Sequence, residues 1–516
     1  MRLPAGLIAV ALGGVYAASF APLSHWAVAL CALGGLVTLL DHEASRGTGP
    51  AGLAGTVFVF AFTAFASGLA WLYVSLHDIG GLPAPLAVAA VAAFSAYLAL
   101  YASGAGLLWA RWGQSQGLFV RSAAFGVLWT IGELARGVVF SGFPWLALGY
   151  SQIDGPFDPL APLLGVHGLG LAAASAATLL ASALMPRARR WPAVIGLLLL
   201  LALPVLLPQP QWVRPSGSAL TVRLVQGNVE QDLKFQPERS LAAMQAYTAA
   251  FEQSRAALTV LPETAWTQTW EWTPETLVAR IEAHASQGHA LALGLPAIHP
   301  PGPDSAPNDF RYSNSVLLIE PGGRIQPADP TQRYDKHHLV PFGEFVPWGF
   351  RWFVDLMRIP LGDFSRGTTT QAPLAVGGQR IAFNICYEDL FGDEIRRPLQ
   401  GEAGATVLIN VSNLGWFGDS HALPQHLAIA RLRSLETGRP MLRATNTGIT
   451  AAIDAQGRVM AQLPAFQAGV LDVSVQGTEG ITPYVRWGDG LLWGVLGIAL
   501  IGLLVGKYRE SANRSR

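Results

Sequence analysis

The sequence predicts a helical membrane bundle that carries a large extramembrane domain of alternating strands and helices. Of its 516 residues, 51% are hydrophobic and only 13% are charged, a balance too apolar for an ordinary soluble protein. Long apolar runs fill the first 208 residues, whereas residues 219–485 show the periodicities of a globular α/β domain. A chain of this length is sufficient for both parts.

The apolar runs are each about 20 residues long, which is the length that a helix needs to cross a bilayer. We expect spans at residues 4–22, 24–41, 54–77, 85–110, 118–136, 160–186, 191–208 and 488–506. The domains are therefore a seven-helix bundle at 1–208, a globular domain at 219–485 and an eighth helix at 488–506. The first run could instead be a cleaved signal peptide, but a second apolar run follows it at once.

The distribution of lysine and arginine around the short loops predicts the orientation of the bundle. One set of loops and span ends carries Arg2, Arg46, Arg111, Arg121, Arg187, Arg189, Arg190, Lys507, Arg509, Arg514 and Arg516. The alternate loops, at 22–24, 78–84 and 137–159, carry none, and Arg136 at a span end is the one exception nearby. Basic loops remain in the cytoplasm. The globular domain is therefore expected on the periplasmic side of a bacterial inner membrane.

Within the globular domain, apolar and β-branched segments predict strands separated by helices. The strands are expected at residues 219–229, 258–261, 291–296, 315–319, 380–386, 406–411 and 448–454. A helix at 237–258 would bury a face that includes Leu241, Met244 and Phe251. Pro274 is expected at the first position of a second helix. This alternation predicts layered α/β packing.

Three polar residues that end or follow apolar strands are the candidates for catalysis. They are Glu263, Lys336 and Cys386. Functional side chains are often presented at the carboxyl ends of strands. A thiol can act as a nucleophile, a carboxylate can take its proton, and an ammonium group can face the oxyanion that develops on an attacked carbonyl. Each residue alone also has an ordinary interpretation, as a solvated loop glutamate, a surface lysine or a small buried thiol.

Charge, cysteine and histidine content argue against several other classes of protein. The 34 basic and 34 acidic residues leave no net charge, so no nucleic-acid partner is expected. Cys31 lies in an apolar run far from Cys386, which argues against a disulfide. The 11 histidines show no paired ligand motif, and the adjacent His337 and His338 would face opposite ways on a strand. We therefore expect neither a metal nor another cofactor.

The three candidates and their surroundings resemble the apolipoprotein N-acyltransferase family of the carbon–nitrogen hydrolase (nitrilase) superfamily. The similar motifs are at 225–228 (VQGN), 334–347 (YDKHHLVPFGEFVP), 386–388 (CYE), 410–413 (NVSN), 416–420 (WFGDS), 425–426 (QH) and 438–440 (GRP). The long 334–347 run is far more specific than a three-letter motif. The resemblance covers nearly the whole chain, and it implies an eight-span bundle with an αββα sandwich domain of the nitrilase type.

The resemblance implies transfer of an acyl chain from a membrane phospholipid to a diacylglyceryl apolipoprotein. The acceptor would be the α-amino group of its N-terminal S-diacylglyceryl cysteine. Cys386 would form the thioester, Glu263 would be the general base and Lys336 would stabilise the oxyanion. The supporting and substrate-binding residues would be Glu344, Tyr387, Glu388, Asn413, Trp416 and Phe235.

Two departures from the family pattern put substrate contacts in doubt but leave the reaction intact. Phe235 stands where a tryptophan is expected, and Leu414-Gly415 follows Asn413 where an acidic residue is expected. Residues 345–366 hold several large apolar side chains, among them Trp348 and Trp352, which suit a lid that faces lipid. A buried core helix is the alternative for this segment.

Two other functions fit parts of the sequence. A membrane-tethered amidase or nitrilase could use the same triad, because water as well as an amine can resolve a thioester. A transporter with an accessory domain would require polar residues in several spans, and only Glu133 and Arg136, near a span end, meet that description. The membrane bundle and the apolar 345–366 segment favour acyl transfer.

Overall fold

The structure, a computed structural model, describes residues 4–185, 190–206, 208–231, 234, 236–301, 310–322, 325–354 and 363–514. The chain divides into two compact units. The first comprises Met1–Tyr73, Ala84–Pro210 and Trp487–Arg516, and the second comprises Val74–Pro83 and Gln211–Arg486. The catalytic candidates all lie in the second unit.

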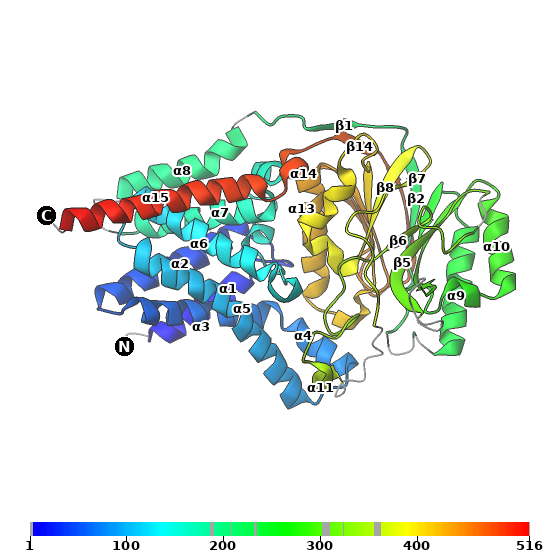
Figure 1. Ribbon diagram of the computed structural model, residues 1–516, viewed down its shortest axis with the longest axis horizontal. Helices are drawn as coiled ribbons and strands as arrows, with labels where there is room; N and C mark the ends of the chain where they lie inside the picture. The colour runs from blue at the N-terminus through cyan, green and yellow to red at the C-terminus, as the bar shows by residue number, and fades with distance from the viewer. Residues whose placement is uncertain are drawn as a thin grey trace. The chain divides into compact units, whose positions relative to one another are not determined.

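The first unit is a bundle of helices whose positions match the predicted spans, apart from the end of the third span (Figure 1). In the described residues its long helices are α1 (Ala5–Ala17), α2 (Trp26–Ser45), α3 (Pro50–Gly68), α5 (Ala84–Trp112), α6 (Leu118–Arg136), α7 (Ala161–Ala183), α8 (Arg190–Leu206) and α15 (Gly490–Arg514). Five of these helical segments, α2, α3, α5, α6 and the one that contains α7, are long and apolar enough to cross a membrane. The apolar stretches of α1, α8 and α15 are shorter. A membrane bundle is therefore confirmed, and the count of eight spans stays a prediction.

Small residues allow the helices of the bundle to approach closely. A Cβ atom on Gly13 of α1 would lie 2.3 Å from the Phe60 carbonyl oxygen of α3. A Cβ atom on Gly126 of α6 would lie 2.8 Å from the Leu171 carbonyl oxygen of α7. Helix association within lipid depends on such close backbone packing, because lipid is as apolar as the side chains themselves.

The third predicted span, 54–77, is wrong at its end. Helix α3 stops at Gly68, where Leu69 leaves helical geometry at φ −110°. A three-residue turn, α4 (Trp71–Tyr73), and a π-helix, η1 (Val74–Ile79), follow it. The residues from Val74 onward belong to the second unit. Hydropathy could not predict this change, because the run remains apolar through Leu76.

The second unit contains two six-stranded sheets. The first has the order β13 (Gly469–Val475), β2 (Leu220–Gln226), β3 (Leu258–Val260), β4 (Ala290–His299), β5 (Arg311–Ile319) and β6 (Arg333–Asp335). The second has the order β12 (Val459–Gln462), β11 (Ala451–Ile453), β10 (Met441–Thr445), β9 (Val407–Ser412), β8 (Gln379–Ile385) and β7 (Leu374–Val376). Strands β2, β3 and β4 run parallel, as do β8, β9 and β10. A short pair, β1 (Val213–Pro215) and β14 (Thr478–Gly480), completes the strands.

Alternating side chains place the two sheets face to face between helices. In β4, Ala292 joins the core between the sheets, whereas Leu291 and Leu293 pack with α9 (Pro237–Glu252) and α10 (Glu275–Ala285). In β9, Ile409 faces the other sheet, and its neighbour Leu408 packs on the side of α13 (Ala422–Thr437). Figure 1 shows these helices on opposite sides of the paired sheets. Fully burying one leucine or isoleucine stabilises such a core by roughly 1.5–3 kcal/mol. The predicted αββα sandwich is confirmed.

All seven predicted strands are present, with small differences at the ends of elements. Helix α9 ends at Glu252, six residues before the predicted end, and Leu241 is 39% exposed rather than buried. Pro274 precedes α10 as its N-cap instead of occupying the first helical position. Among the described residues, the sequence interpretation missed α13 and seven strands: β1, β6, β7, β10, β12, β13 and β14.

Candidate active site

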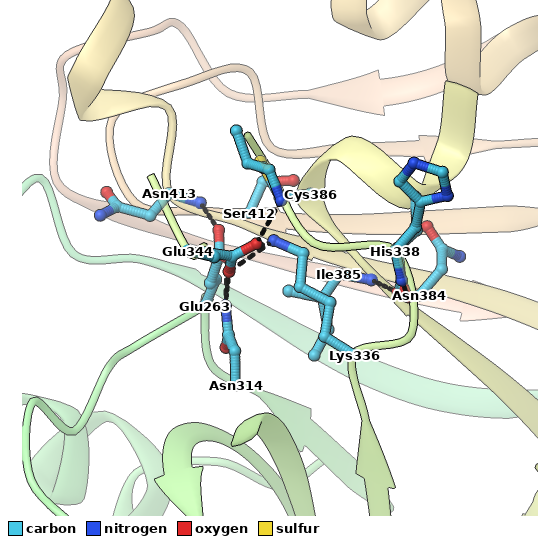
Figure 2. A network of polar contacts seen from close by, with 12 residues as sticks. Glu263, Asn314, Lys336, His338, Glu344, Asn384, Ile385, Cys386, Ser412 and Asn413 are labelled. Carbon is cyan, nitrogen blue, oxygen red and sulfur yellow. Dashed lines mark hydrogen bonds and ion pairs between the residues drawn. The ribbon is translucent and has the colours of Figure 1, made fainter. Parts of the chain in front are cut away.

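Glu263, Lys336 and Cys386 each lie just beyond the end of a strand. Glu263 follows β3, Lys336 follows β6 and Cys386 follows β8. The backbone N–H of Asn413, at the end of β9, donates to Glu263 Oε2 at 2.7 Å. This bond connects the carboxyl ends of the two sheets and brings the predicted residues to one place (Figure 2).

A buried cluster of charges forms the centre of the site. Lys336 Nζ lies 3.2 Å from Glu263 Oε1 and 2.9 Å from Glu344 Oε1. Asn314 Nδ2 donates to both of these oxygens at 2.7 Å. All four side chains are buried, and buried charges are tolerated only when they are paired and hydrogen-bonded. The carboxylate of Glu263 therefore keeps a fixed direction, and its negative charge acts on Cys386, which Figure 2 draws in the same network.

Cys386 occupies a sharp turn between β8 and a 3-10 helix, η6 (Cys386–Leu390). Its φ angle is +50°, in the left-handed region that non-glycine residues rarely adopt. Holding a residue there costs on the order of 1–3 kcal/mol and requires support from its surroundings. Both cysteines are free thiols, as expected; Cys386 is buried and Cys31 is exposed.

The Glu388 carboxylate connects the turn at Cys386 to the segment that carries Lys336. Its Oε2 atom accepts from the Ile385 N–H at 2.7 Å and from the Tyr334 hydroxyl at 2.9 Å. Its Oε1 atom accepts from the His337 N–H at 2.6 Å and from the His338 N–H at 3.1 Å. The nucleophile and the cation are thus positioned by the same side chain.

The electrostatics of the site favour a thiol that needs a base. Burial, followed by the negative charge of Glu263, raises the pKa of Cys386 above its ordinary value, and Lys336 opposes this shift. Although burial favours the neutral amine, the charges of Glu263 and Glu344 raise the pKa of Lys336, which stays an ammonium group. Burial raises the pKa of Glu388 to about 7, against the opposing effect of its backbone N–H partners. A resting thiol beside a fixed carboxylate is the arrangement that proton abstraction requires.

The remaining predicted residues surround this centre. Asn413 Nδ2 donates to Gln231 Oε1 at 2.8 Å. The Tyr387 ring is buried beside the rings of His338 and Phe391, with centroids 5.8 and 5.3 Å away. The Trp416 carbonyl oxygen, in the 3-10 helix η8 (Leu414–Phe417), accepts from the Ser75 hydroxyl of η1 at 2.6 Å.

Two predictions concern residues that the structure does not describe. Phe235 lies outside the described residues, as do residues 355–362 of the 345–366 segment. In the described part of that segment, Trp348 is 98% exposed and Trp352 is 63% exposed. A buried core helix is therefore wrong for these two side chains.

The sequence interpretation missed two residues that contact the cluster. Asn314 sits on the face of β5 that also carries Val316 and Leu318, which belong to the core between the sheets. A polar side chain at a core-facing position of an apolar strand was the signal available for it. Lys234 is buried and donates to the Glu263 carbonyl oxygen at 3.3 Å, and burial lowers its pKa to about 8. No local pattern distinguished this lysine from a surface residue.

Comparisons with known proteins support the resemblance of the motifs. Residues 12–179 match the apolipoprotein N-acyltransferase N-terminal domain, and residues 221–484 match the carbon-nitrogen hydrolase family. The apolipoprotein N-acyltransferase of Bordetella bronchiseptica is 44% identical over 97% of this chain and 96% of its own length. That of Ralstonia nicotianae is 43% identical, over 99% and 95%. That of Neisseria meningitidis serogroup B is 35% identical, over 95% and 94%. The chain therefore belongs to the apolipoprotein N-acyltransferase family, and its second unit has the carbon–nitrogen hydrolase fold.

Proposed function

We propose that this protein transfers an acyl chain from a membrane phospholipid to the α-amino group of an S-diacylglyceryl cysteine at the N-terminus of an apolipoprotein. The reaction passes through a thioester on Cys386. The observation that carries the proposal is the buried Glu263–Lys336–Glu344 cluster beside Cys386, in a chain that matches apolipoprotein N-acyltransferases over almost its full length.

In the first half-reaction, Glu263 takes the proton of the Cys386 thiol as the sulfur attacks the ester carbonyl of the phospholipid. The Lys336 ammonium group stabilises the negative charge that develops on the carbonyl oxygen. The carbon–oxygen bond then breaks, and the proton on Glu263 passes to the departing lysophospholipid. The acyl chain remains on the sulfur as a thioester.

In the second half-reaction, the α-amino group attacks the thioester. An α-amino group has an unperturbed pKa of roughly 8, so a base that removes its second proton assists the attack. Glu263 takes that proton and returns it to the sulfur as the carbon–sulfur bond breaks. Cys386 is only 9% exposed, which limits the access of water that would otherwise hydrolyse the thioester.

The surrounding residues have supporting roles. Glu344 and Asn314 hold Lys336 and Glu263 in place, and Glu388 orients the turn at Cys386. Tyr387 supports this turn through its ring contacts. We assign Asn413, Trp416 and Phe235 to the region that receives substrate, by the family resemblance.

The setting of the reaction is a bacterial membrane. We further propose that residues 1–208 and 488–506 anchor the chain in the inner membrane and that the catalytic domain, 219–485, faces the periplasm. The loop charges support this orientation, because the basic residues around the short loops fall on one side. A reporter that is active only in the periplasm should be active when fused after Ser218 and silent when fused after Arg190. The reverse pattern would overturn the orientation.

The acyl-enzyme provides the direct test of the reaction. The purified protein is incubated with labelled phospholipid, and mass spectrometry locates the adduct. An acyl group is expected on Cys386 in the wild type and in Cys31→Ala, and none in Cys386→Ala. An adduct that persists in Cys386→Ala would refute the assignment.

The acceptor is tested in the same preparation. A diacylglyceryl peptide should discharge the adduct and yield an N-acylated product. Release of free fatty acid alone would favour the hydrolase alternative, a membrane-tethered amidase or nitrilase.

A further inference from the structure

A row of polar side chains crosses the second sheet on the side of α13, away from the core between the sheets. Asn384 of β8, Asn410 of β9 and Arg443 of β10 are register neighbours on three adjacent strands. All three are almost completely buried. Burying a polar side chain is costly unless it is hydrogen-bonded, so we expect each member of the row to have a hydrogen-bond partner.

The row continues into a buried network around His426 of α13. Arg443 Nη1 donates to Asp389 Oδ2 at 2.9 Å, and Arg443 Nη2 lies 2.6 Å from His426 Nδ1. His426 Nε2 lies 3.0 Å from Asp389 Oδ1. Asp389 belongs to η6, the 3-10 helix that begins at Cys386. The network therefore connects β10 and α13 to the turn that carries the thiol.

The contact with Arg443 determines which nitrogen of His426 carries the proton. A guanidinium group can only donate hydrogen bonds, so His426 Nδ1 must accept from it. The ring proton consequently resides on Nε2. From there it is directed at the Cys386 carbonyl oxygen, 3.3 Å away. Asn410 Nδ2 donates to the same oxygen at 3.2 Å.

We propose that His426 is a positioning residue for the nucleophile: held by Arg443, which in turn binds Asp389, it donates from Nε2 to the Cys386 carbonyl and maintains the left-handed turn that directs the thiol at Glu263. This inference rests on the proposed role of Cys386. The turn is strained at φ +50°, and its two sides are held separately. Glu388 binds the Ile385 N–H before the turn, whereas His426 and Asn410 bind the carbonyl after it.

Two substitutions separate this role from simple packing. Glutamine places its amide nitrogen close to the position of histidine Nε2, so His426→Gln can still donate to the Cys386 carbonyl. Asparagine is one bond shorter and matches only Nδ1, so His426→Asn can retain the contact with Arg443 but not the one with Cys386. His284→Asn is the matched control. His284 lies in α10, is also buried, and contacts the backbone carbonyl of Ser254.

The variants are compared in a Cys31→Ala background by two measurements. The first is the rate of Cys386 alkylation by iodoacetamide, which needs no lipid. The second is the rate of acyl-enzyme formation from phospholipid as a function of its concentration. We expect His426→Asn to lower both rates by roughly 10- to 100-fold with little change in KM, since small errors in the position of a reacting group are costly. His426→Gln should remain within about threefold of wild type, and the control should be unchanged.

Equal rates for the asparagine and glutamine variants, at any level, would overturn the inference, because loss of packing would then explain the effect. A change confined to KM would overturn it as well. If alkylation follows the expected order but the wild type forms no acyl-enzyme, the positioning role stands and the proposed function fails. If the wild type forms the acyl-enzyme and His426→Asn matches it in both rates, the function stands and the positioning role fails.

Discussion

Replacing Lys336 with methionine should affect stability and catalysis in ways that can be separated. Methionine has a similar volume but no charge, so Glu263 and Glu344 would remain buried without their cation. Their Oε1 atoms both accept from the amide nitrogen of Asn314 at 2.7 Å, which places them close together. At a separation of roughly 5 Å and an effective dielectric constant of about 20, two such charges repel by about 3 kcal/mol.

That repulsion is consistent with the general cost of removing one partner from a buried ion pair, about 3–5 kcal/mol. The variant should therefore unfold at a lower temperature by about 10 °C, measured by intrinsic tryptophan fluorescence in detergent. Loss of the oxyanion's positively charged partner should also slow acyl-enzyme formation by about 10²-fold or more.

A second substitution distinguishes the two effects. Adding Glu344→Gln to Lys336→Met removes one of the two repelling charges, so most of the lost stability should return while acyl-enzyme formation remains slow. If Lys336→Met unfolds at the wild-type temperature, the proposed electrostatics of the cluster are wrong. If it forms the acyl-enzyme at a near-normal rate, Lys336 does not stabilise the oxyanion.

Three further outcomes are expected. Glu263→Gln should slow acyl-enzyme formation by ~10²–10⁴-fold, because it keeps the shape and removes the base; near-normal turnover would exclude that role. Since the pKa of Glu388 is raised to about 7 in the fold, from roughly 4.3 when unfolded, its contribution to stability is greatest below pH ~4.3 and is lost as the pH rises through 7. The rate of acylation should instead fall as the pH drops below ~7, because all four hydrogen-bond partners of Glu388 are donors and a protonated carboxyl accepts fewer of them. In Glu388→Gln, neither the melting temperature nor the acylation rate should show this dependence on pH. Replacing Trp348 and Trp352 with serine should weaken phospholipid use in vesicles and leave Cys386 alkylation unchanged; an unchanged KM would exclude a lipid-facing role.

The fold was predictable where burial imposes a clear period on the sequence. A strand such as β4 is apolar on both faces because it lies between a sheet and a helix layer, and all seven strands predicted from apolar runs exist. Most of the missed strands are short or lie at an edge, whereas β10 is a central strand whose apolar run is interrupted by Arg443. In β13, exposed and partly buried residues alternate over most of its length, so Gly469–Val475 shows no continuous apolar run.

The site was predictable as a set of residue types but not as a set of contacts. Glu263 and Cys386 were found because each ends or follows a predicted strand, and Lys336 was found because it lies within the long 334–347 motif. Asn314 was not found, and His426 was found only as part of the 425–426 motif, without its contact. Their partners are distant in sequence: Asn314 binds Glu263 across 51 positions, and His426 contacts the Cys386 carbonyl across 40. Such pairs become apparent only when the fold brings together β5 with the end of β3, and α13 with the end of β8.

The inclusion of Val74–Pro83 in the second unit bears on how this enzyme could be divided or recombined. Ser75 and Trp416 are 341 positions apart, yet their hydrogen bond holds the η8 turn that directly follows Asn413. Nearby, a Cβ atom on Gly418 would lie 2.8 Å from the Val74 side chain, so only glycine fits against η1 there. A soluble fragment cut from residues 211–486 would lack this support. Chimaeras between relatives should accordingly exchange residues 74–83 and 414–418 together, because each segment depends on contacts with the other.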